Sequence, residues 1–179
     1  MPLRRVAVMG MAGAGKSTLA VELGRALGAP VFHLDAIYWK PGWVASSWDE
    51  FREAQRELLA LDRWVLDGNY STGGLAERLE RADAVVVVKA PRWLALSRVV
   101  RRSLHHRGAT RPDLGADKPE RLDPKFLRCV WDWERNHPDF VETLRRQASG
   151  KPVVEVRSRR DAQRLVEEAR RRVERTDKS

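Results

Sequence analysis

The sequence predicts an α/β fold of three layers, in which a five-stranded parallel sheet is covered by helices on both faces. Short apolar segments alternate along the chain with amphipathic segments of helical period. The fourth apolar segment contains four consecutive valines, which is typical of a strand buried on both faces. The chain has 179 residues, of which 42% are apolar, so we expect one domain with a hydrophobic core.

The first half of the chain predicts three strands. They are short apolar runs at residues 5–9, 30–35 and 63–67. A helix over 16–27 repeats apolar residues at spacings of three and four, and Gly28 is suited to its C-terminal cap. An aromatic loop follows the second strand, and Ser47 with Glu50 forms a capping-box pattern that predicts the start of the next helix.

The second half continues the alternation. A short helix at 75–81 precedes the fourth strand, 84–89, and Pro91 opens a helix that extends to about His105. Residues 107–123 lose periodicity and predict a long functional loop. The remaining predicted elements are a helix opened by Asp123 and Pro124, a helix from Pro138 to Gly150, a strand at 153–156 and a last helix capped by Ser158 and Asp161.

The composition excludes several classes of protein. The longest aliphatic run, Val85–Val88, is far shorter than the roughly 20 residues of a membrane span, and no secretory signal is visible, so we expect a cytoplasmic protein. A single cysteine, Cys129, cannot form an internal disulfide, and no Cys/His cluster has zinc-site spacing. The net charge of +9 comes mainly from arginine and fits nucleotides, nucleic acid, or a generally arginine-rich surface.

A glycine-rich segment between the first strand and the first helix matches the complete GxxxxGK[ST] pattern of a phosphate-binding loop. Converging backbone N–H groups bind phosphate only where side chains do not obstruct it, and the following helix adds a positive dipole. Lys16 is expected to contact the β and γ phosphates of ATP, and the Ser17 hydroxyl to ligate Mg²⁺. The alternative is a tight glycine turn with an incidental lysine. The predicted phosphate-binding residues are Gly10, Ala12, Gly13, Ala14, Gly15, Lys16, Ser17 and Thr18.

Two aspartates end the second and third predicted strands, at the edge where open parallel sheets bind ligands. Asp67 is suited to the acidic position of the magnesium shell. Asp35 could accept a hydrogen bond from an acceptor hydroxyl and act as the base that assists its attack. Either aspartate could instead serve only the loop that follows its strand.

A run of cationic residues without any acidic residue precedes and enters the long loop. Its members are Lys89, Arg92, Arg98, Arg101, Arg102, Arg107 and Arg111. We expect a basic helical lid at roughly 98–137, in which Arg98 and Arg102 neutralise the transferred phosphate, although a plain solvated face explains such a run equally well. The tryptophans are expected mainly in the core, although Trp39 and Trp43 could line the mouth of a pocket. The four histidines are expected as structural or surface residues, and Cys129 as a small core residue of an apolar helix and not a nucleophile.

Five segments together resemble the small adenylate-kinase-like P-loop kinases, and in particular the bacterial family labelled DNA topology modulation protein. They are GMAGAGKST at 10–18, HLDAIYWKPGW at 33–43, LDGNYS at 66–71, PRWLALSRVVRRSLHHRG at 91–108 and RSRRD at 157–161. The resemblance implies a P-loop NTPase fold of the nucleoside-kinase type with sheet order 2-3-1-4-5. It also implies ATP and Mg²⁺ as cofactors and Asp67 near magnesium.

By the same resemblance, Asn69 and Tyr70 lie near the acceptor, and the turn beginning at Arg157 borders the ATP base. The predicted acceptor contacts are Asp35, Tyr38, Asn69 and Tyr70. One departure stands out: adenylate kinases continue from Asp-Gly into Phe-Pro-Arg, whereas this chain has Asn69, Tyr70 and Ser71. The arginine that would bind the phosphate of an acceptor nucleotide is therefore missing.

Three functions are compatible with these features. The first is ATP- and Mg²⁺-dependent phosphoryl transfer to a small acceptor, such as a nucleoside, a nucleotide or a hydroxylated metabolite. The second is a nucleic-acid-associated ATPase that modulates DNA topology, for which no nucleic-acid-binding motif is present. The third is a nucleotide-binding regulator without catalysis. We expect a monomer or a homodimer and no membrane partner.

Overall fold

The main sheet of the computed structural model has five parallel strands. They are β1 (Arg5–Gly10), β2 (Val31–His33), β5 (Trp64–Asp67), β6 (Ala84–Val88) and β7 (Val153–Val156). Their order is β2-β5-β1-β6-β7, which is 2-3-1-4-5 when these strands are counted along the chain, as predicted. The structure describes residues 3–106, 108, 117–119 and 122–176. Within them, no helix is long and apolar enough to span a membrane.

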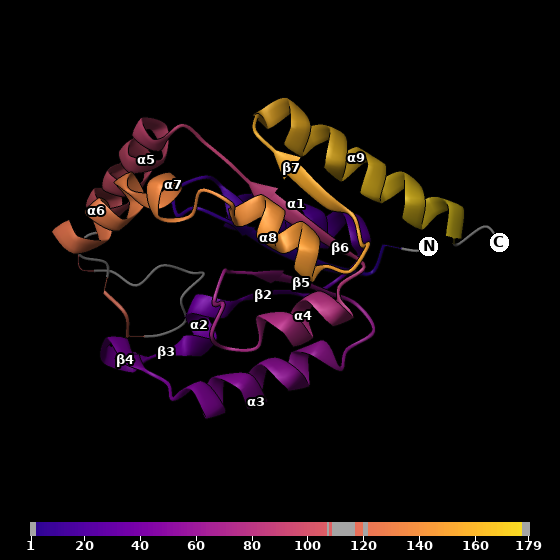
Figure 1. Cartoon of the computed structure of the whole chain (residues 1–179), viewed down its shortest axis with the longest axis horizontal. Helices are drawn as coiled ribbons and strands as arrows, with labels where there is room; N and C mark the ends of the chain where they lie inside the picture. The colour runs from indigo at the N-terminus through magenta and orange to yellow at the C-terminus, as the bar shows by residue number, and fades with distance from the viewer. Residues whose placement is uncertain (1–2, 107, 109–116, 120–121, 177–179) are drawn as a thin grey trace.

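Helices cover both faces of this sheet (Figure 1). The described helices are α1 (Lys16–Leu27), α2 (Leu34–Tyr38), α3 (Trp48–Leu59), α4 (Leu75–Arg81), α5 (Arg92–His105), α6 (Pro124–Trp131), α7 (Trp133–Asn136), α8 (Phe140–Gln147) and α9 (Arg159–Thr176). Side chains alternate along β1: Val6 and Val8 pack with α1 and α9, whereas Ala7 and Met9 face the layer of α3, α4 and α8. The three-layer α/β fold is therefore confirmed.

Several predicted helix ends are confirmed by the caps. Gly28 caps α1 in the left-handed conformation, and Ser47 and Glu50 form both hydrogen bonds of the capping box of α3. The Ser158 hydroxyl accepts a hydrogen bond from the Asp161 N–H at the start of α9. The predicted helix from Pro138 begins later, at Phe140, and the short helix α7, Trp133–Asn136, precedes it.

The second strand is shorter than predicted. It ends at His33, and Leu34 begins α2 with its side chain fully buried, so Asp35 lies in the first turn of a short helix instead of at a strand end. Burial of Leu34 beneath Gly68 favours this turn, because an added Cβ on Gly68 would lie 2.8 Å from the Leu34 Cβ. The aromatic segment then forms a small antiparallel pair, β3 (Trp39–Lys40) and β4 (Val44–Ala45), joined by the 3₁₀ turn η1 (Pro41–Trp43).

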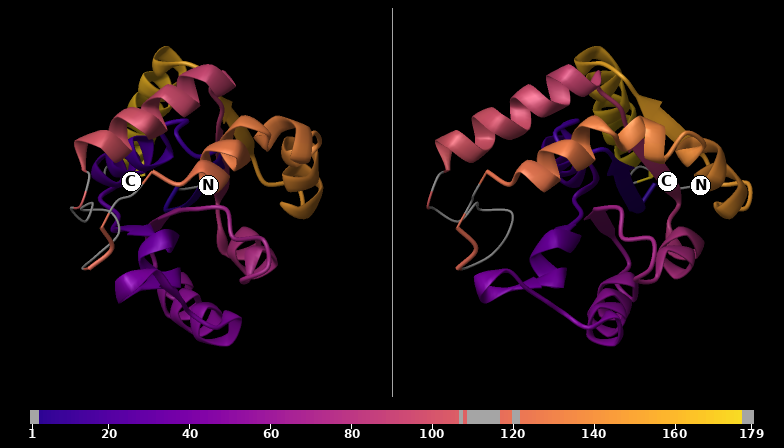
Figure 2. Two further views of the ribbon diagram at one scale, coloured as in Figure 1. Left: turned by 90° about the vertical axis from the view of Figure 1, so that its left-hand side faces the viewer. Right: turned by 60° about the vertical axis from the view of Figure 1, so that its left-hand side comes forward.

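Helices α5 and α6 lie side by side and project from one end of the sheet, above α2 and the β3–β4 pair (Figure 2). Two hydrogen bonds connect that pair to residues 117–119: the Gly42 N–H donates to the Asp117 carbonyl at 2.8 Å, and the Trp43 indole to the Pro119 carbonyl at 3.0 Å. Most of the predicted loop at 107–123 and the lid residues Arg107 and Arg111 lie outside the described residues.

The predicted burial of the tryptophans is confirmed for Trp64 and wrong for three of the seven, and Trp39, Trp43 and Trp133 are half-buried. Trp64 on β5 is fully buried, but Trp48, Trp93 and Trp131 are exposed on helices α3, α5 and α6. Cys129 is also exposed instead of packing in a core. The apolar residues of α5 and α6 therefore do not form one buried stripe: Val99 and Val130 are buried, whereas Trp93 and Trp131 on the same helices are exposed.

Candidate active site

The segment after β1 wraps into a compact loop. Gly13 and Gly15 both have positive φ, at 78° and 104°, a conformation that L-residues with a side chain rarely adopt. Within the described residues, the backbone N–H groups of Gly13, Gly15, Lys16 and Ser17 donate no hydrogen bond. An added Cβ on Gly15 meets no atom within 4 Å. Free N–H donors beside open space, at the N-terminus of α1, are the groups that an anion would require.

Lys16 and Ser17 at the start of α1 face the carboxyl ends of β1 and β5. The Lys16 ammonium reaches back across the loop to the Met11 carbonyl at 3.1 Å. The Ser17 hydroxyl donates to Oδ2 of Asp67 at 2.6 Å. Because β1 and β5 pair in parallel with Val8 beside Asp67, the sheet register itself brings this carboxylate to the loop.

Asp67 is buried and charged. Burial raises the pKa of its carboxyl, but the hydrogen bond from His33, the charge of Lys16 and the hydrogen bond from Ser17 outweigh burial, and the net pKa lies below its ordinary value. The His33 ring nitrogen Nδ1 lies 2.9 Å from Asp67 Oδ2. Sequence reasoning missed His33, which was expected to be structural or on the surface. No local sequence pattern identifies this contact, because it depends on the pairing of β2 with β5, which sets His33 beside Asp67.

The site fits a magnesium ion that is shared with a phosphate ligand. The second carboxylate oxygen of Asp67, Oδ1, is buried and has no hydrogen-bond partner. Within the described residues, no group of three or more His, Cys, Asp or Glu side chains could hold a metal by itself. Mg²⁺ typically takes one or two protein oxygens and completes its shell with water and phosphate, so Ser17 and Asp67 suffice in number and type.

Asn69 and Tyr70, which follow Asp67, connect two parts of the site. The Asn69 side-chain amide accepts a hydrogen bond from the Gly10 N–H and donates to the Gly10 carbonyl, both at 2.9 Å. The Tyr70 hydroxyl donates to Asp35 Oδ1 at 2.6 Å. Burial and the charge of Asp35 raise the pKa of the Tyr70 hydroxyl, so it remains a donor. Asn69 therefore faces the phosphate loop and Tyr70 the exposed Asp35 carboxylate.

Aromatic rings surround Tyr70. The Tyr38 ring lies 5.0 Å from that of Tyr70 and stacks on Trp48, and Phe51 on α3 packs 4.9 Å from the Tyr70 ring. The structure thus brings together Asp35, Tyr38 and Tyr70, three of the residues predicted to face an acceptor.

Arg78 on α4 is a further residue that sequence reasoning missed. It is fully buried, and its guanidinium donates to the carbonyls of Gly68, Asn69 and Tyr70 at 3.1, 2.6 and 3.1 Å. Burial lowers the pKa of Arg78 to about 10, and its Nε has no hydrogen-bond partner. A buried cation held only by carbonyl groups is costly, which points to a specific role for the backbone that it holds.

Helix α5 packs directly on the phosphate loop. An added Cβ on Gly13 would lie 2.3 Å from the Ala95 carbonyl oxygen. The Arg98 guanidinium, one turn along α5, lies 3.3 Å from the Ala14 carbonyl. Arg102 is half-buried on the next turn of α5. The structure thus brings Arg98 to the loop.

Lys118 contacts α2 next to Asp35. Its ammonium donates to the Ala36 carbonyl at 3.2 Å, and the residue is only 3% exposed. Burial lowers the pKa of Lys118, and the nearby charge of Asp35 partly offsets this. No sequence pattern identified Lys118, because it lies in a segment without periodicity.

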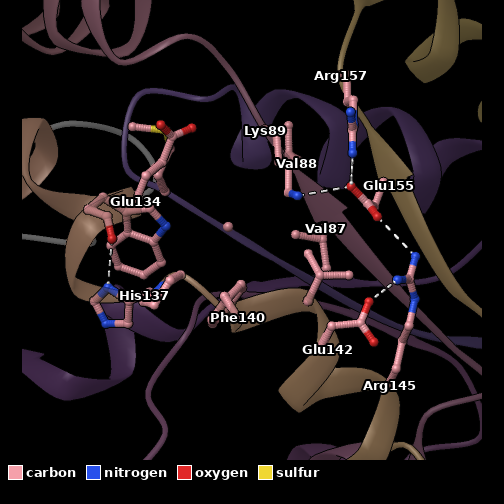
Figure 3. Close-up of a pocket in the computed structure, with 15 residues that line it drawn as sticks. Val87, Val88, Lys89, Glu134, His137, Phe140, Glu142, Arg145, Glu155 and Arg157 are labelled. Atoms are coloured by element: carbon pink, nitrogen blue, oxygen red, sulfur yellow. Dashed lines mark hydrogen bonds and ion pairs between the residues drawn. The ribbon is translucent and has the colours of Figure 1, made fainter.

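A cavity of about 440 Å³ lies beside the phosphate loop, between the ends of β1, β6 and β7 and the segment α7–α8. Glu155 at its rim pairs with Lys89, Arg145 and Arg157 at 2.8–2.9 Å (Figure 3). The hydrogen bonds from Arg157 and Lys89 lower the pKa of Glu155 to about 2. The Trp133 and His137 rings stack on the opposite wall, 4.1 Å apart. Arg157 therefore lies near the loop, at the rim of this cavity.

Neither a protein-family model nor a curated protein matches the sequence. Similarity to the DNA topology modulation family therefore rests on the motifs alone.

Solved structures do match the fold. Shikimate kinase from Acinetobacter baumannii, in complex with shikimate, matches with a TM-score of 0.53 and 23% identity over 93% of this chain and 90% of that chain. Shikimate kinase from Bacteroides thetaiotaomicron matches with a TM-score of 0.54 and 16% identity over 96% and 98%. A protein from Chloroflexus aurantiacus gives a TM-score of 0.55 and 15% identity over 95% and 98%. The chain therefore has a shikimate-kinase-like α/β fold over nearly its whole length.

Proposed function

We propose that this protein transfers the γ-phosphoryl group of ATP to a hydroxyl group of a small molecule, with Mg²⁺ as cofactor. The observation that carries the proposal is the set of contacts around Asp67: Ser17 and His33 bind one carboxylate oxygen, and the other is buried without a partner beside the open N–H cradle. A plain glycine turn needs no buried carboxylate at this place. The likeness to shikimate kinases supports a small-molecule acceptor.

The donor side is formed by the phosphate loop and α1. The free N–H groups of residues 13 and 15–17 would bind the β and γ phosphates, with Ala12, Ala14 and Thr18 completing the loop. Lys16 would leave the Met11 carbonyl and bind a phosphate oxygen, which is a stronger acceptor because it is charged. Arg157, at the rim of the adjacent cavity, would lie beside the base.

Ser17 and Asp67 would hold the magnesium ion, which supplies charge neutralisation between the β and γ phosphates when it is bound. The lowered pKa of Asp67 keeps the carboxylate ionised at neutral pH, as a metal ligand must be. His33 would orient that carboxylate so that Oδ1 is directed away from the ring.

The acceptor side is formed by Asp35 and the aromatic residues around it. Asp35 is exposed, and its Oδ1 already accepts a hydrogen bond from Tyr70, so Oδ2 would accept the proton of the attacking hydroxyl. Tyr38 would border the bound acceptor. Arg98, and Arg102 one turn further along α5, would neutralise the charge that develops on the transferred group.

The proposal is tested by following labelled γ-phosphate from ATP across a panel of nucleosides, nucleotides, shikimate and other hydroxylated metabolites. Lys16→Ala should lower transfer by about a hundredfold or more, because one preorganised charge on the transferred group is lost. The matched control is Arg25→Ala, an exposed cation at the far end of the same helix, which should keep the wild-type rate.

Three results would contradict the proposal. Release of free phosphate without any phosphorylated product contradicts transfer. Release that depends on DNA and weakens steeply with salt would favour the nucleic-acid-associated ATPase instead. Binding of ATP without turnover on any acceptor would favour a nucleotide-binding regulator.

A further inference from the structure

The proposed donor and acceptor sites are joined by one short segment, residues 68–70, which we call the coupling loop. Its first contact is with the donor side, where the Asn69 amide forms two hydrogen bonds with the Gly10 peptide at 2.9 Å each. Gly10 is the first residue of the phosphate loop. An amide bonded to both the N–H and the carbonyl of one residue fixes its orientation in two directions.

The second contact of the coupling loop is with the acceptor side. The next residue, Tyr70, donates its hydroxyl to Asp35 at 2.6 Å, a short hydrogen bond to a charged acceptor. Tyr70 also has a positive φ of 32°, which is unusual for a residue with a bulky side chain. A backbone in this conformation persists only where surrounding contacts hold it.

Arg78 provides those contacts. Its guanidinium donates to the carbonyls of all three residues of the coupling loop, and it lies fully buried in the layer of α4. Three carbonyl oxygens that converge on one planar cation cannot move independently of each other. Displacement of Tyr70 is therefore transmitted to Asn69, and from Asn69 to the phosphate loop.

We propose that the coupling loop links acceptor binding to ATP binding: Tyr70 senses the state of Asp35, Asn69 sets the position of Gly10, and Arg78 holds both residues in one rigid unit. This inference rests on the proposed function, because it assigns the acceptor to Asp35 and ATP to the phosphate loop. Arg78 and Asn69 act here as positioning residues. The consequence is that ATP is bound in its reactive geometry only when the hydrogen bond between Tyr70 and Asp35 is formed.

The coupling can be measured without knowing the acceptor, because it predicts that a change beside Asp35 alters ATP affinity at a distance. The probe is Mg·ATP alone, titrated by calorimetry into the wild-type protein, Tyr70→Phe, Asn69→Ala and the double variant. Asn69→Ala should weaken binding about tenfold, and Tyr70→Phe about threefold, although the Tyr70 hydroxyl contacts Asp35 and not the phosphate loop. In the Asn69→Ala background, Tyr70→Phe should have no further effect.

Arg78→Lys should weaken Mg·ATP binding about as much as Asn69→Ala, because a lysine cannot reach three carbonyls in one plane. Its matched control is Arg63→Lys, which removes a similar arginine contact, to the Leu27 carbonyl at 3.0 Å, at the opposite end of α1. Arg63→Lys should bind Mg·ATP as the wild type does. If Arg78→Lys fails to fold, the cycle of Asn69 and Tyr70 variants still decides the question.

The outcomes separate this inference from the function on which it rests. Non-additive effects at Asn69 and Tyr70 support the coupling. Strictly additive effects, or a Tyr70→Phe variant with wild-type affinity, overturn the coupling while leaving kinase activity intact. A wild-type protein that binds no Mg·ATP overturns the proposed function and the coupling together.

Discussion

Two glycines of the phosphate loop, Gly13 and Gly15, should respond differently to the same added methyl group. At Gly13, the new Cβ would lie 2.3 Å from the Ala95 carbonyl oxygen and 3.0 Å from Cγ2 of Val99. At Gly15, the new Cβ would meet no protein atom within 4 Å. Both residues have positive φ, so both substitutions carry the backbone cost of about 1–2 kcal/mol of a left-handed residue. That shared cost cancels when the two variants are compared.

The difference is the steric cost at Gly13. Ala95 and Val99 are 0% and 1% exposed, so α5 cannot yield without loosening the core beneath it. Overpacking of a tight core typically costs about 1–3 kcal/mol. For a domain of this size, 1 kcal/mol lowers Tm by about 2–4 °C, so Gly13→Ala should unfold roughly 2–12 °C below Gly15→Ala.

The order of the two variants in ATP affinity should differ from their order in thermal stability. The open space beside Gly15 is the volume that we assign to phosphate, so the methyl group of Gly15→Ala should weaken ATP binding about tenfold or more while the protein stays the more stable of the two. Thermal unfolding by circular dichroism gives the first ranking and calorimetry with Mg·ATP the second. The reasoning is refuted if Gly15→Ala binds ATP like the wild type, or if Gly13→Ala melts no lower than Gly15→Ala.

Three further predictions follow from single contacts. Arg98→Ala should lower kcat about tenfold with little change in Tm, whereas Arg164→Ala, on the exposed side of α9, should leave initial rates unchanged. Asp67→Asn should raise the Mg²⁺ concentration needed for half-maximal rate about tenfold or more, and an unchanged requirement would contradict its place in the metal shell. Arg157 and Lys89 hold the pKa of Glu155 at about 2 instead of 4.5, so the stability it contributes is present above pH 4.5 and is lost as pH falls through 2. The Tm difference between the wild type and Glu155→Gln should shrink over that range.

The elements that depend on local pattern were predictable from sequence. The four consecutive valines predicted β6. Gly28 predicted the end of α1, and the capping-box pattern predicted the start of α3. The spacing of the glycines and Lys16 located the phosphate loop. These signals arise from neighbours within a few residues, so they need no knowledge of the fold. The order of the five strands required the family resemblance, because strand order is a long-range property that hydrophobic period does not encode.

The residues missed within the site depend on contacts between distant segments. His33 reaches Asp67 only because β2 and β5 are neighbours in register, which places residues 34 positions apart at the same edge. Asp35 was expected at a strand end, but burial of Leu34 stops the strand two residues earlier. A short window of sequence predicts neither the contact of His33 nor the end of β2, because both depend on β5 and Gly68, which are distant in the sequence.

Arg78 shows why such residues escape a search by type. In LAERLER it occupies a position between Leu75 and Leu79 that looks like the boundary of an exposed face, and arginine is the commonest charged residue of this chain. It is fully buried because three backbone carbonyls of the coupling loop converge on it, and those carbonyls are free because Gly68, Asn69 and Tyr70 leave the sheet without forming a helix. The buried charge and the irregular loop therefore require each other: the loop needs a donor for its carbonyls, and the cation needs acceptors away from water. That mutual requirement holds Asn69 on the phosphate loop and Tyr70 on Asp35.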